Sequence, residues 1–381
     1  ELKIDPLELR RINFIKKDNF PYRSSTGETI DVGDFDRVLS AAEISADIEG
    51  FEKRKKESEA KGMLRGLGLC YYIESILGDP SEEAKVVFEE GLDVKIFVGT
   101  QSNGQGHETV FAQFLSDQIG IPIEKITVVQ GDTDLIPNGG GTGGSRSVTV
   151  QNNATLATVE KVIQSFSQYL SEKLEVSLEN IEFDDISFRI NGSNYSPNVL
   201  EVAKMAFDDH RFDLLTHSAK ATLDARSFPN GAHFAEVEVD PETGFVQVVR
   251  YSVVDDFGNL INPMLAQGQV HGGVAQGIGQ ALYEHVVFDQ EGQLLTATFM
   301  DYGMPRAQDL PYYKFETECV PSTANIMGMK GCGEAGTVGA LAAVANAVQD
   351  ALWDIGIQQV DMPFTSEKIW SMINLGNLAA E

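Results

Sequence analysis

The 381 residues of this chain include 29 lysines and arginines and 57 aspartates and glutamates, which gives a formal net charge of −28. Such an excess of negative charge disfavours nucleic acid and anionic membrane surfaces as partners. A chain of this length can bury a large core and is more often built as two lobes than as one. Its three cysteines, Cys70, Cys319 and Cys332, have no CxxC spacing, so the sequence indicates neither a disulfide framework nor a zinc or iron–sulfur cluster.

The sequence contains no signal for membrane insertion or export. Its apolar runs are shorter than the roughly 18 residues that a membrane-spanning helix needs, and no signal peptide opens the chain. We therefore expect a cytoplasmic protein without membrane insertion. The chain starts at Glu1 and continues directly into a polar, helix-like segment, which is typical of the middle of a longer protein.

Residues 1–62 predict an N-terminal helical connection. A short helix and a polar stretch lead to residue 35. From 36 to 61, apolar residues recur on one side of a charged segment, which predicts one helix that packs on that side only.

Residues 63–175 predict a first α+β lobe. Runs rich in β-branched and aromatic residues predict strands at 66–75, 84–90, 92–99 and 126–130. Apolar residues at helical spacing predict a helix over 107–119, which ends at Gly120, and a long helix over 145–174.

Residues 176–381 predict a second α+β lobe. We expect helices over 199–207, 263–282 and 337–352, and strands at 217–223, 232–239 and 246–254. Residues 241–244 predict a hairpin turn, and a loop region with Pro305 and Pro311 follows residue 282. The strands outnumber those of one continuous βαβ winding, so the predicted class is α+β, with the boundary between the lobes within 175–215.

Several joints between these elements are rich in glycine. Gln105 and Gly106 stand at the start of the predicted helix 107–119, and Gln269 follows Gly268 in a second Gly-Gln pair. A glutamine amide offers donors and an acceptor without charge, which suits phosphate oxygens or ring nitrogens. Residues 138–147 join five glycines with Thr142, Ser145, Arg146 and Ser147 ahead of a helix, a composition typical of a phosphate cradle. A flexible surface linker is the alternative.

Glu334 lies within the glycine-rich turn 331–336, just before the predicted helix 337–352. It is either a partner of the helix dipole or a catalytic base beside a bound cofactor. In the same turn, Cys332 is either a reactive thiol or a small residue tolerated in a crowded turn. Two GxGxxG matches, at 139–144 and 331–336, lack the preceding strand and the later acidic residue of a Rossmann site. The HExxH and GxSxG signatures are absent from the sequence.

From residue 5 onward, the chain resembles the molybdenum hydroxylases, the family of xanthine dehydrogenase, aldehyde oxidase and aerobic carbon monoxide dehydrogenase. The resemblance is to the C-terminal half of their molybdenum-binding subunit. It depends on five motifs in family order: GQG at 104–106, GTGGSRS at 141–147, 255–280 with GQVHGGVAQGIGQ, MDYGMPR at 300–306 and KGCGEAG at 330–336. The GTGGSRS form is closer to the bacterial carbon monoxide dehydrogenase-like branch.

The resemblance implies a two-lobed molybdopterin-binding domain that hydroxylates carbon with oxygen from water. It implies that the cofactor is molybdopterin with molybdenum, in bacteria commonly the cytosine dinucleotide, and that Glu334 is the base that activates the Mo–OH group. The cofactor-binding residues that it implies are Gln105, Gly106, Thr142, Gly143, Gly144, Ser145, Arg146, Ser147 and Gln269. Gly144 is the position whose backbone comes near the metal.

The resemblance also implies missing parts. The family's GGxFG loop and its substrate-orienting arginine loop precede the matched region, and neither is found in this sequence. We expect the missing N-terminal half of the subunit as a partner, iron–sulfur and flavin groups on partner domains or subunits, and a dimer of the full complex. The chain is either a fragment or a naturally split subunit, and we expect it to be inactive without the missing half. A non-catalytic nucleotide-binding or cofactor-delivery protein is the alternative function.

Overall fold

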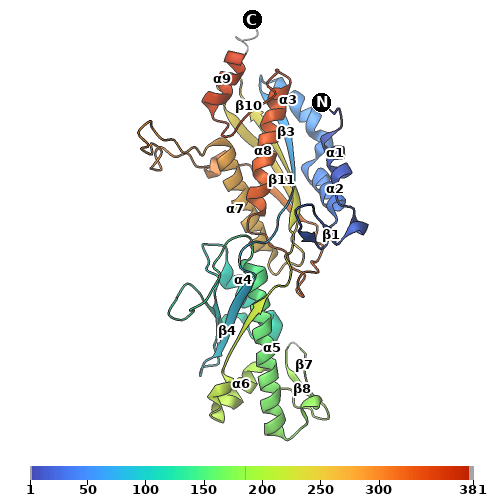
Figure 1. The fold of residues 1–381 in the computed structure, drawn as a ribbon, viewed down its shortest axis with the longest axis vertical. Helices are drawn as coiled ribbons and strands as arrows, with labels where there is room; N and C mark the ends of the chain where they lie inside the picture. The colour runs from blue at the N-terminus through green and yellow to red at the C-terminus, as the bar shows by residue number, and fades with distance from the viewer. Residues whose placement is uncertain (1, 185, 377–381) are drawn as a thin grey trace.

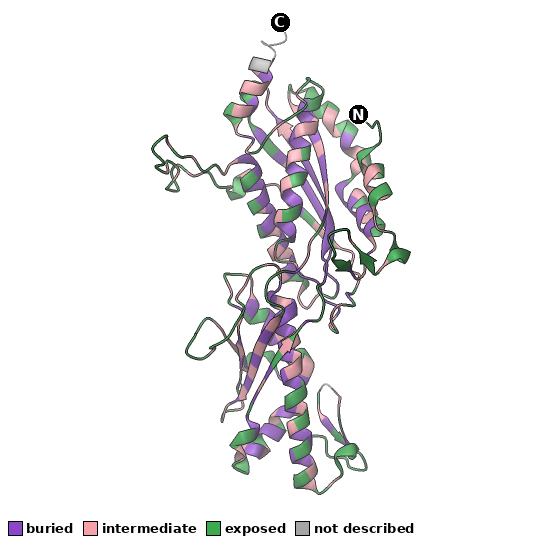
Figure 2. Cartoon of the chain, viewed as in Figure 1, coloured by how far each residue is buried: buried purple, intermediate pink, exposed green. Residues whose placement is uncertain are grey.

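The computed structural model describes residues 2–184 and 186–376, which form two α+β lobes stacked along the long axis of the molecule (Figure 1). Each lobe contains a four-stranded sheet, with the strand orders β12-β11-β10-β3 and β6-β5-β4-β9. We call them the β10 lobe and the β4 lobe. Most strand residues of the β10 lobe are buried, whereas in the β4 lobe buried strand residues alternate with half-buried or exposed ones (Figure 2). The predicted α+β class and two-lobed architecture are confirmed.

The β10 lobe has helices on both faces of its sheet. The sheet consists of β3 (Leu64–Ile73), β10 (Asn230–Val239), β11 (Val246–Asp256) and β12 (Tyr313–Thr317). One face is covered by α7 (Pro263–Leu282), α8 (Ala335–Trp353) and α9 (Ser366–Gly376), and the other by α1 (Pro6–Asn13), α2 (Phe35–Ala46) and α3 (Phe51–Glu59). Because both faces are covered, the central strand β10 is buried along almost its whole length.

The β4 lobe packs its sheet against one long helix. Its strands are β4 (Ser81–Phe88), β5 (Val94–Val98), β6 (Ile126–Val129) and β9 (Thr216–Thr222). The 28-residue helix α5 (Ser147–Leu174) lies on β4 and β9, and α4 (His107–Ile119) and α6 (Val199–Asp208) complete the core. Two small hairpins stand apart, β1 (Tyr22–Arg23) with β2 (Thr29–Ile30), and β7 (Ile181–Phe183) with β8 (Phe188–Ile190).

The lobes do not follow one another along the chain as predicted. The division at residue 175 assigns β3 and β9 to the wrong lobes, because β3 pairs with β10 and β9 pairs with β4. The chain crosses from the β10 lobe to the β4 lobe after residue 73 and returns before residue 230. The two crossing segments are hydrogen-bonded to each other, with the Glu74 N–H donating to the Pro229 carbonyl at 2.9 Å.

The predicted N-terminal connection is, over its described residues 2–62, part of the β10 lobe, since α2 packs on β10 and β11. The single helix predicted over 36–61 is wrong. It breaks at Asp47, which has the left-handed conformation (φ 55°) and ends α2 with bonds to the carbonyls of Glu43 and Ile44. The predicted helices 107–119 and 263–282 are confirmed at both ends.

Close backbone approach sets the position of α8. A Cβ atom at Gly66 or Gly68 of β3 would overlap with the backbone of Ala347 or Ala343, so these glycines let α8 lie directly on the strand. Gly273 of α7 likewise meets α8, where its Cβ would lie 2.9 Å from the Cα of Gly336. The first turn of α8 is therefore held beside α7.

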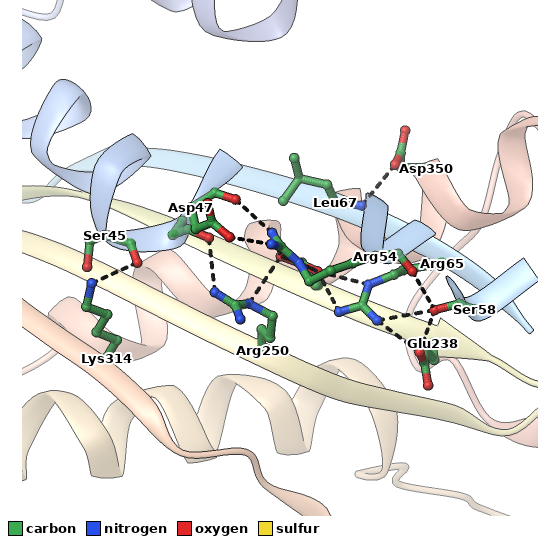
Figure 3. Close-up of polar contacts among 12 residues, drawn as sticks. Ser45, Asp47, Arg54, Ser58, Arg65, Leu67, Glu238, Arg250, Lys314 and Asp350 are labelled. Atoms are coloured by element: carbon green, nitrogen blue, oxygen red, sulfur yellow. Dashed lines mark hydrogen bonds and ion pairs between the residues drawn. The ribbon is translucent and has the colours of Figure 1, made fainter. Parts of the chain in front are cut away.

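A network of arginines and glutamates connects α2 and α3 to the sheet (Figure 3). The Glu236 carboxylate, 4% exposed, accepts hydrogen bonds from Arg54 at 2.7 Å and from Arg65 at 2.6 Å, and it forms an ion pair with Arg250 at 3.3 Å. Arg65 also contacts Glu238 at 2.9 Å. We call this group the Glu236 cluster. Each buried carboxylate in it has a cation, as buried charge requires.

Candidate functional site

A cleft of about 290 Å³ lies where the two lobes meet. The β4 lobe contributes residues from 103–110 and 142–148, and the β10 lobe contributes residues from 259–269 and 329–334. Three of the glycine-rich joints that the sequence indicated therefore lie in one place. They come together because the starts of α4, α5 and α8 all point to the junction between the lobes (Figure 1).

The loop before α5 forms one wall of the cleft. Thr142, Gly143, Gly144, Ser145 and Ser147 all line it. Gly144 has a φ of 62°, and a Cβ atom there would lie 2.9 Å from the Cβ of Leu77, whereas a Cβ at Gly143 would meet no atom within 4 Å. The loop is anchored, because the Thr142 hydroxyl donates to the Gln101 carbonyl at 2.6 Å and the Ser147 hydroxyl donates to Thr142 Oγ1 at 3.2 Å. It is not the flexible linker that the sequence left open.

Arg146 is the exception in this loop. It is 2% exposed and does not line the cleft, and its guanidinium forms an ion pair with Glu82 at 2.8 Å. It also donates to the carbonyls of Asp79, Ser81 and Gly141. In this structure the Arg146 donors attach the loop to β4 and are not directed into the cleft, so its position does not support the predicted role in cofactor binding.

The two glutamines differ in their surroundings. Gln105 lines the cleft, and its side-chain oxygen accepts from the backbone of Asn103. Its neighbour Gly106 does not line the cleft. It begins α4 with a φ of 80°, and a Cβ there would lie 2.8 Å from Leu265 Cδ2. Gln269 lines the cleft from α7 and donates its amide to the Gly333 carbonyl at 2.7 Å.

Glu334 lies at the edge of the cleft, at the N-terminal end of the 19-residue helix α8. Its side chain is exposed and makes no capping bond to the helix. Instead, the Ser145 hydroxyl donates to Glu334 Oε2 at 3.2 Å, and the Glu334 N–H donates to Ser145 Oγ at 3.0 Å. The carboxylate is thus held by the opposite lobe and faces the cleft.

A buried ion pair anchors the turn that carries Glu334. Lys330 Nζ lies 2.5 Å from Asp256 Oδ2, and both side chains are fully buried. Asp256 also accepts from the backbone of Gly258 and Val320. In the sequence, Lys330 was noted only as part of the KGCGEAG motif. The sequence signal for its ion pair is that Lys330 is basic, whereas the segment that forms β11 ends in two aspartates.

The surroundings of Cys332 disfavour a reactive thiol. Burial, with the nearby carboxylates of Asp255 and Glu74, raises its pKa to about 12, so the thiolate is scarcely populated near neutral pH. The interpretation as a small residue in a crowded turn therefore holds.

Sequence reasoning missed Glu74, which follows β3 on the first crossing segment. Both of its carboxylate oxygens are buried and have no hydrogen-bond partner within the described ranges. Burial raises its pKa to about 7; the nearby Ser145 hydroxyl opposes this increase, and the carboxylates of Glu334 and Asp255 add to it. A glutamate at the end of an apolar strand was the only signal in the sequence.

Within residues 2–184 and 186–376, no helix has the length and apolar character to span a membrane. The same residues contain no group of three or more histidine, cysteine, aspartate or glutamate side chains arranged to hold a metal ion.

Comparison with known proteins places these loops in a family. Residues 41–311 match the model of the molybdopterin cofactor-binding domain. The carbon monoxide dehydrogenase large chain of Hydrogenophaga pseudoflava is 31% identical over all of this chain and 49% of its own length. The nicotine 6-hydroxylase large subunit of Paenarthrobacter nicotinovorans is 33% identical over 97% of this chain and 47% of that subunit.

Solved structures agree. Carbon monoxide dehydrogenase from Oligotropha carboxidovorans superimposes with a TM-score of 0.89 at 29% identity, over 99% of this chain and 50% of that one. Quinoline 2-oxidoreductase from Pseudomonas putida 86 gives 0.89 at 30% identity, over 98% and 50%. The chain thus spans about half the length of the relatives that it matches.

Proposed function

Because the chain belongs to the molybdenum hydroxylase family, we propose that it forms one wall of a molybdopterin site in which Glu334 is the base for carbon hydroxylation with water-derived oxygen. The observation that carries this proposal is the position of Glu334, a carboxylate at the cleft edge that Ser145 of the opposite lobe fixes. A pure partner of the helix dipole would not need this cross-lobe contact.

The residues of the cleft fit a molybdopterin. They provide neutral donors and acceptors (Gln105, Gln269 and the hydroxyls of Thr142, Ser145 and Ser147) on glycine-rich backbone that a flat, phosphate-bearing ligand can approach closely. Gly143 borders open space on the cleft side, as a close backbone contact requires. We propose that these residues hold the pterin and the phosphates, with the backbone of Gly144 nearest to the metal.

When bound, the molybdenum centre would supply the oxygen-transfer and two-electron chemistry. This chain would supply the proton acceptor. Ser145 donates to Glu334 Oε2, and Oε1, to which no described residue donates a hydrogen bond, could accept a proton from a group in the cleft. Gln269 fixes the turn through Gly333, so the carboxylate keeps its place during the transfer.

We propose that the complete enzyme needs further parts. These are the half of the molybdenum subunit that carries the GGxFG and arginine loops, iron–sulfur and flavin groups on partner domains or subunits, and a dimeric assembly. The cytosine dinucleotide form of the cofactor is proposed from the resemblance to the bacterial branch. Relatives named for carbon monoxide, nicotine and quinoline leave the substrate of this chain open.

The test of the base is Glu334→Gln in the complete enzyme. The amide keeps the shape and the bond to Ser145 but cannot accept the proton, so the reductive half-reaction should slow by about 10²–10⁴-fold. Stopped-flow measurement gives the rate, and cofactor content should stay near that of the parent. If the rate remains within about threefold of the parent, Glu334 is not the base.

A second test concerns completeness. The chain spans about half the length of its relatives, and we propose that the other half completes the site. The chain purified alone should therefore contain little molybdenum, and co-expression with a GGxFG-bearing half should restore it. Metal analysis that finds close to one molybdenum per isolated chain would contradict the need for the other half.

A non-catalytic cofactor-delivery protein remains the alternative. It predicts that Glu334→Gln changes neither turnover of the assembled enzyme nor cofactor content, since a carrier has no use for a base.

A further inference from the structure

One of the five sequence motifs lies away from the cleft. MDYGMPR, at 300–306, contributes no residue to the cleft lining, whereas each of the other four motifs does. It belongs to a segment, residues 285–306, that leaves the end of α7 and projects from the β10 lobe (Figure 1). We call this segment the arm. None of its residues, all of which the structure describes, is buried, so the arm has no core of its own (Figure 2).

Hydrogen bonds restrict the backbone of the arm. Its two sides pair with each other, since the Leu295 N–H donates to the Val287 carbonyl at 2.8 Å. At its base, the Tyr302 hydroxyl donates to Glu284 Oε2 at 2.6 Å. Because the arm already has this structure, little conformational entropy is lost when it binds a partner.

A tight turn presents two apolar side chains of the arm. The Thr298 hydroxyl donates to Asp301 Oδ2 at 2.7 Å, and the Tyr302 N–H donates to the Thr298 carbonyl at 2.9 Å. Between these fixed positions, the side chains of Phe299 and Met300 are 88% and 92% exposed. The other apolar residues of the arm that are at least half exposed are Val286, Phe288, Leu295 and Met304. Single exposed apolar side chains are normal, but a cluster of them on one structured arm marks an interaction surface.

The relatives indicate what covers this surface. The superposition on carbon monoxide dehydrogenase from Oligotropha carboxidovorans spans 99% of this chain, the position of the arm included, but 50% of that chain. The relative therefore has about as much chain again as the part that corresponds to this one. A second half of similar size is available to cover the arm.

The dimensions of such a half are sufficient. A compact unit of about 380 residues has a radius of gyration of about 21 Å. Along α7, Gln269 at the cleft and Leu282 at the start of the arm are about 20 Å apart. A half of this size that closes the cleft can therefore also contact the arm.

Charge disfavours a second copy of this chain as the partner. The arm has three carboxylates, Asp289, Glu291 and Asp301, and one arginine, Arg306, and the whole chain has a net charge of −28. Two copies would bring like charges together, which opposes association. The same carboxylates favour a partner with basic residues around its binding pocket.

We propose that the arm docks into an apolar pocket with a basic rim on the other half of the molybdenum subunit, with Phe299 and Met300 as the anchors. An aromatic ring and a flexible thioether are suited to fill such a pocket. This proposal rests on the proposed function, which requires that half to complete the cleft. Because the arm continues α7, and α7 places Gln269 at the cleft, docking holds the other half against the lobe that carries Glu334.

Photo-cross-linking of the complete enzyme tests the partner of the arm. Phe299 is replaced by benzoylphenylalanine, a photoreactive residue that is also aromatic, and the cross-linked peptides are identified by mass spectrometry. We expect them to join the arm to the GGxFG-bearing half. The matched control is the same replacement at Ile44, which is 81% exposed on α2, on the face of the sheet opposite to α7. It should not give the same peptides.

Thiol labelling provides a second measurement if the photoreactive variant folds poorly. In the complete enzyme, Met300→Cys should react with a soluble maleimide at least about tenfold more slowly than Ile44→Cys, because a docked side chain reacts only when the arm opens. The enzyme without either substitution gives the background from Cys70, Cys319 and Cys332.

Three results would overturn the proposal. They are cross-links from position 299 to a second copy of this chain or to the iron–sulfur or flavin parts instead of the GGxFG-bearing half, no cross-link in a folded variant, and equal labelling of Met300→Cys and Ile44→Cys. Failure of the proposed function is a different observation, because it appears in the rate of Glu334→Gln and in the molybdenum content of the isolated chain.

Discussion

Two groups of buried carboxylates in this molecule contrast with each other. In the Glu236 cluster, three arginines surround one carboxylate and tie α2 and α3 to the sheet (Figure 3). At the junction of the lobes, Glu74 and Asp255 each leave at least one buried oxygen without a partner in the described residues. We call these the junction carboxylates. Arginines neutralise the carboxylate of Glu236, whereas the described residues pair neither junction carboxylate with an arginine or a lysine.

The contrast between paired and unpaired buried carboxylates indicates which of them are candidates for a functional role. A paired buried carboxylate has its pKa held down and its geometry fixed, so it stabilises the fold but cannot exchange a proton near neutral pH. An unpaired one costs folding free energy and is retained where its proton is useful. The four experiments below change one member of a paired or an unpaired group, from the largest expected effect to the smallest.

The largest effect is expected for Arg146→Ala. Both side chains of the Arg146–Glu82 pair are almost fully buried (3% and 1% exposed), so the variant leaves an unpaired buried carboxylate. The unfolding free energy should fall by about 3–5 kcal/mol in urea denaturation of the purified chain. The control Arg189→Ala removes an exposed pair and should cost at most about 1 kcal/mol. A stable Arg146→Ala chain would mean that the loop does not depend on this pair.

Glu236→Gln should have the next largest effect. It removes the common partner of Arg54, Arg65 and Arg250, whose side chains are 15%, 9% and 42% exposed. Because water can partly solvate these arginines, we expect a loss of about 2–3 kcal/mol, below the usual cost of a fully buried pair. Denaturation monitored by circular dichroism gives the value, and the exposed Glu49→Gln serves as the control. Equal stability of the two variants would show that the Glu236 cluster does not stabilise the fold.

Glu74→Gln should raise the unfolding free energy, whereas the two preceding variants should lower it. The pKa of Glu74 is raised from 4.5 to about 7 in the folded chain, so between these values the folded state holds a proton that the unfolded state has lost. The unfolding free energy of the parent therefore falls as pH rises through this range. Glu74→Gln removes this loss, about 1–2 kcal/mol after allowance for solvent screening of a half-buried group. Denaturation below and above the range, with Glu90→Gln as control, should show a parent that loses stability relative to Glu74→Gln. If the unfolding free energies of the parent and of Glu74→Gln change with pH in parallel, Glu74 does not have the raised pKa of an unpaired buried carboxylate.

The smallest effect is expected at Ser145, which joins the two lobes through Glu334. Ser145→Ala removes one neutral hydroxyl with two bonds to Glu334, at a cost of about 1 kcal/mol. Ser145 has a φ of 55°, which glycine adopts more readily, so Ser145→Gly should melt above Ser145→Ala despite losing the same hydroxyl. The reverse order in thermal melting would show that backbone conformation does not limit this position.

The sequence determined those parts of the protein that depend on local pattern. Apolar spacing and a terminal glycine predicted the helix 107–119, and the helix 263–282 was likewise predicted with the bounds that the structure shows. The glycine-rich motifs predicted a family, and their positions ahead of helices predicted where a ligand would lie. Thr142 to Ser145, Ser147, Gln105, Gln269 and Glu334 do meet at one cleft.

Only the tertiary structure decided what depends on partners far apart in the chain. β3 and β9 lie in other lobes than predicted, because their positions depend on pairing with β10 and β4, which no local pattern encodes. An arginine in a glycine-rich loop has the same sequence signature whether it binds a ligand or another side chain. In the folded chain, Arg146 forms an ion pair with Glu82, which is 64 residues away. Glu74 shows the same limit, because whether a glutamate is solvated or buried without a partner depends on the loop and the turn that close over it.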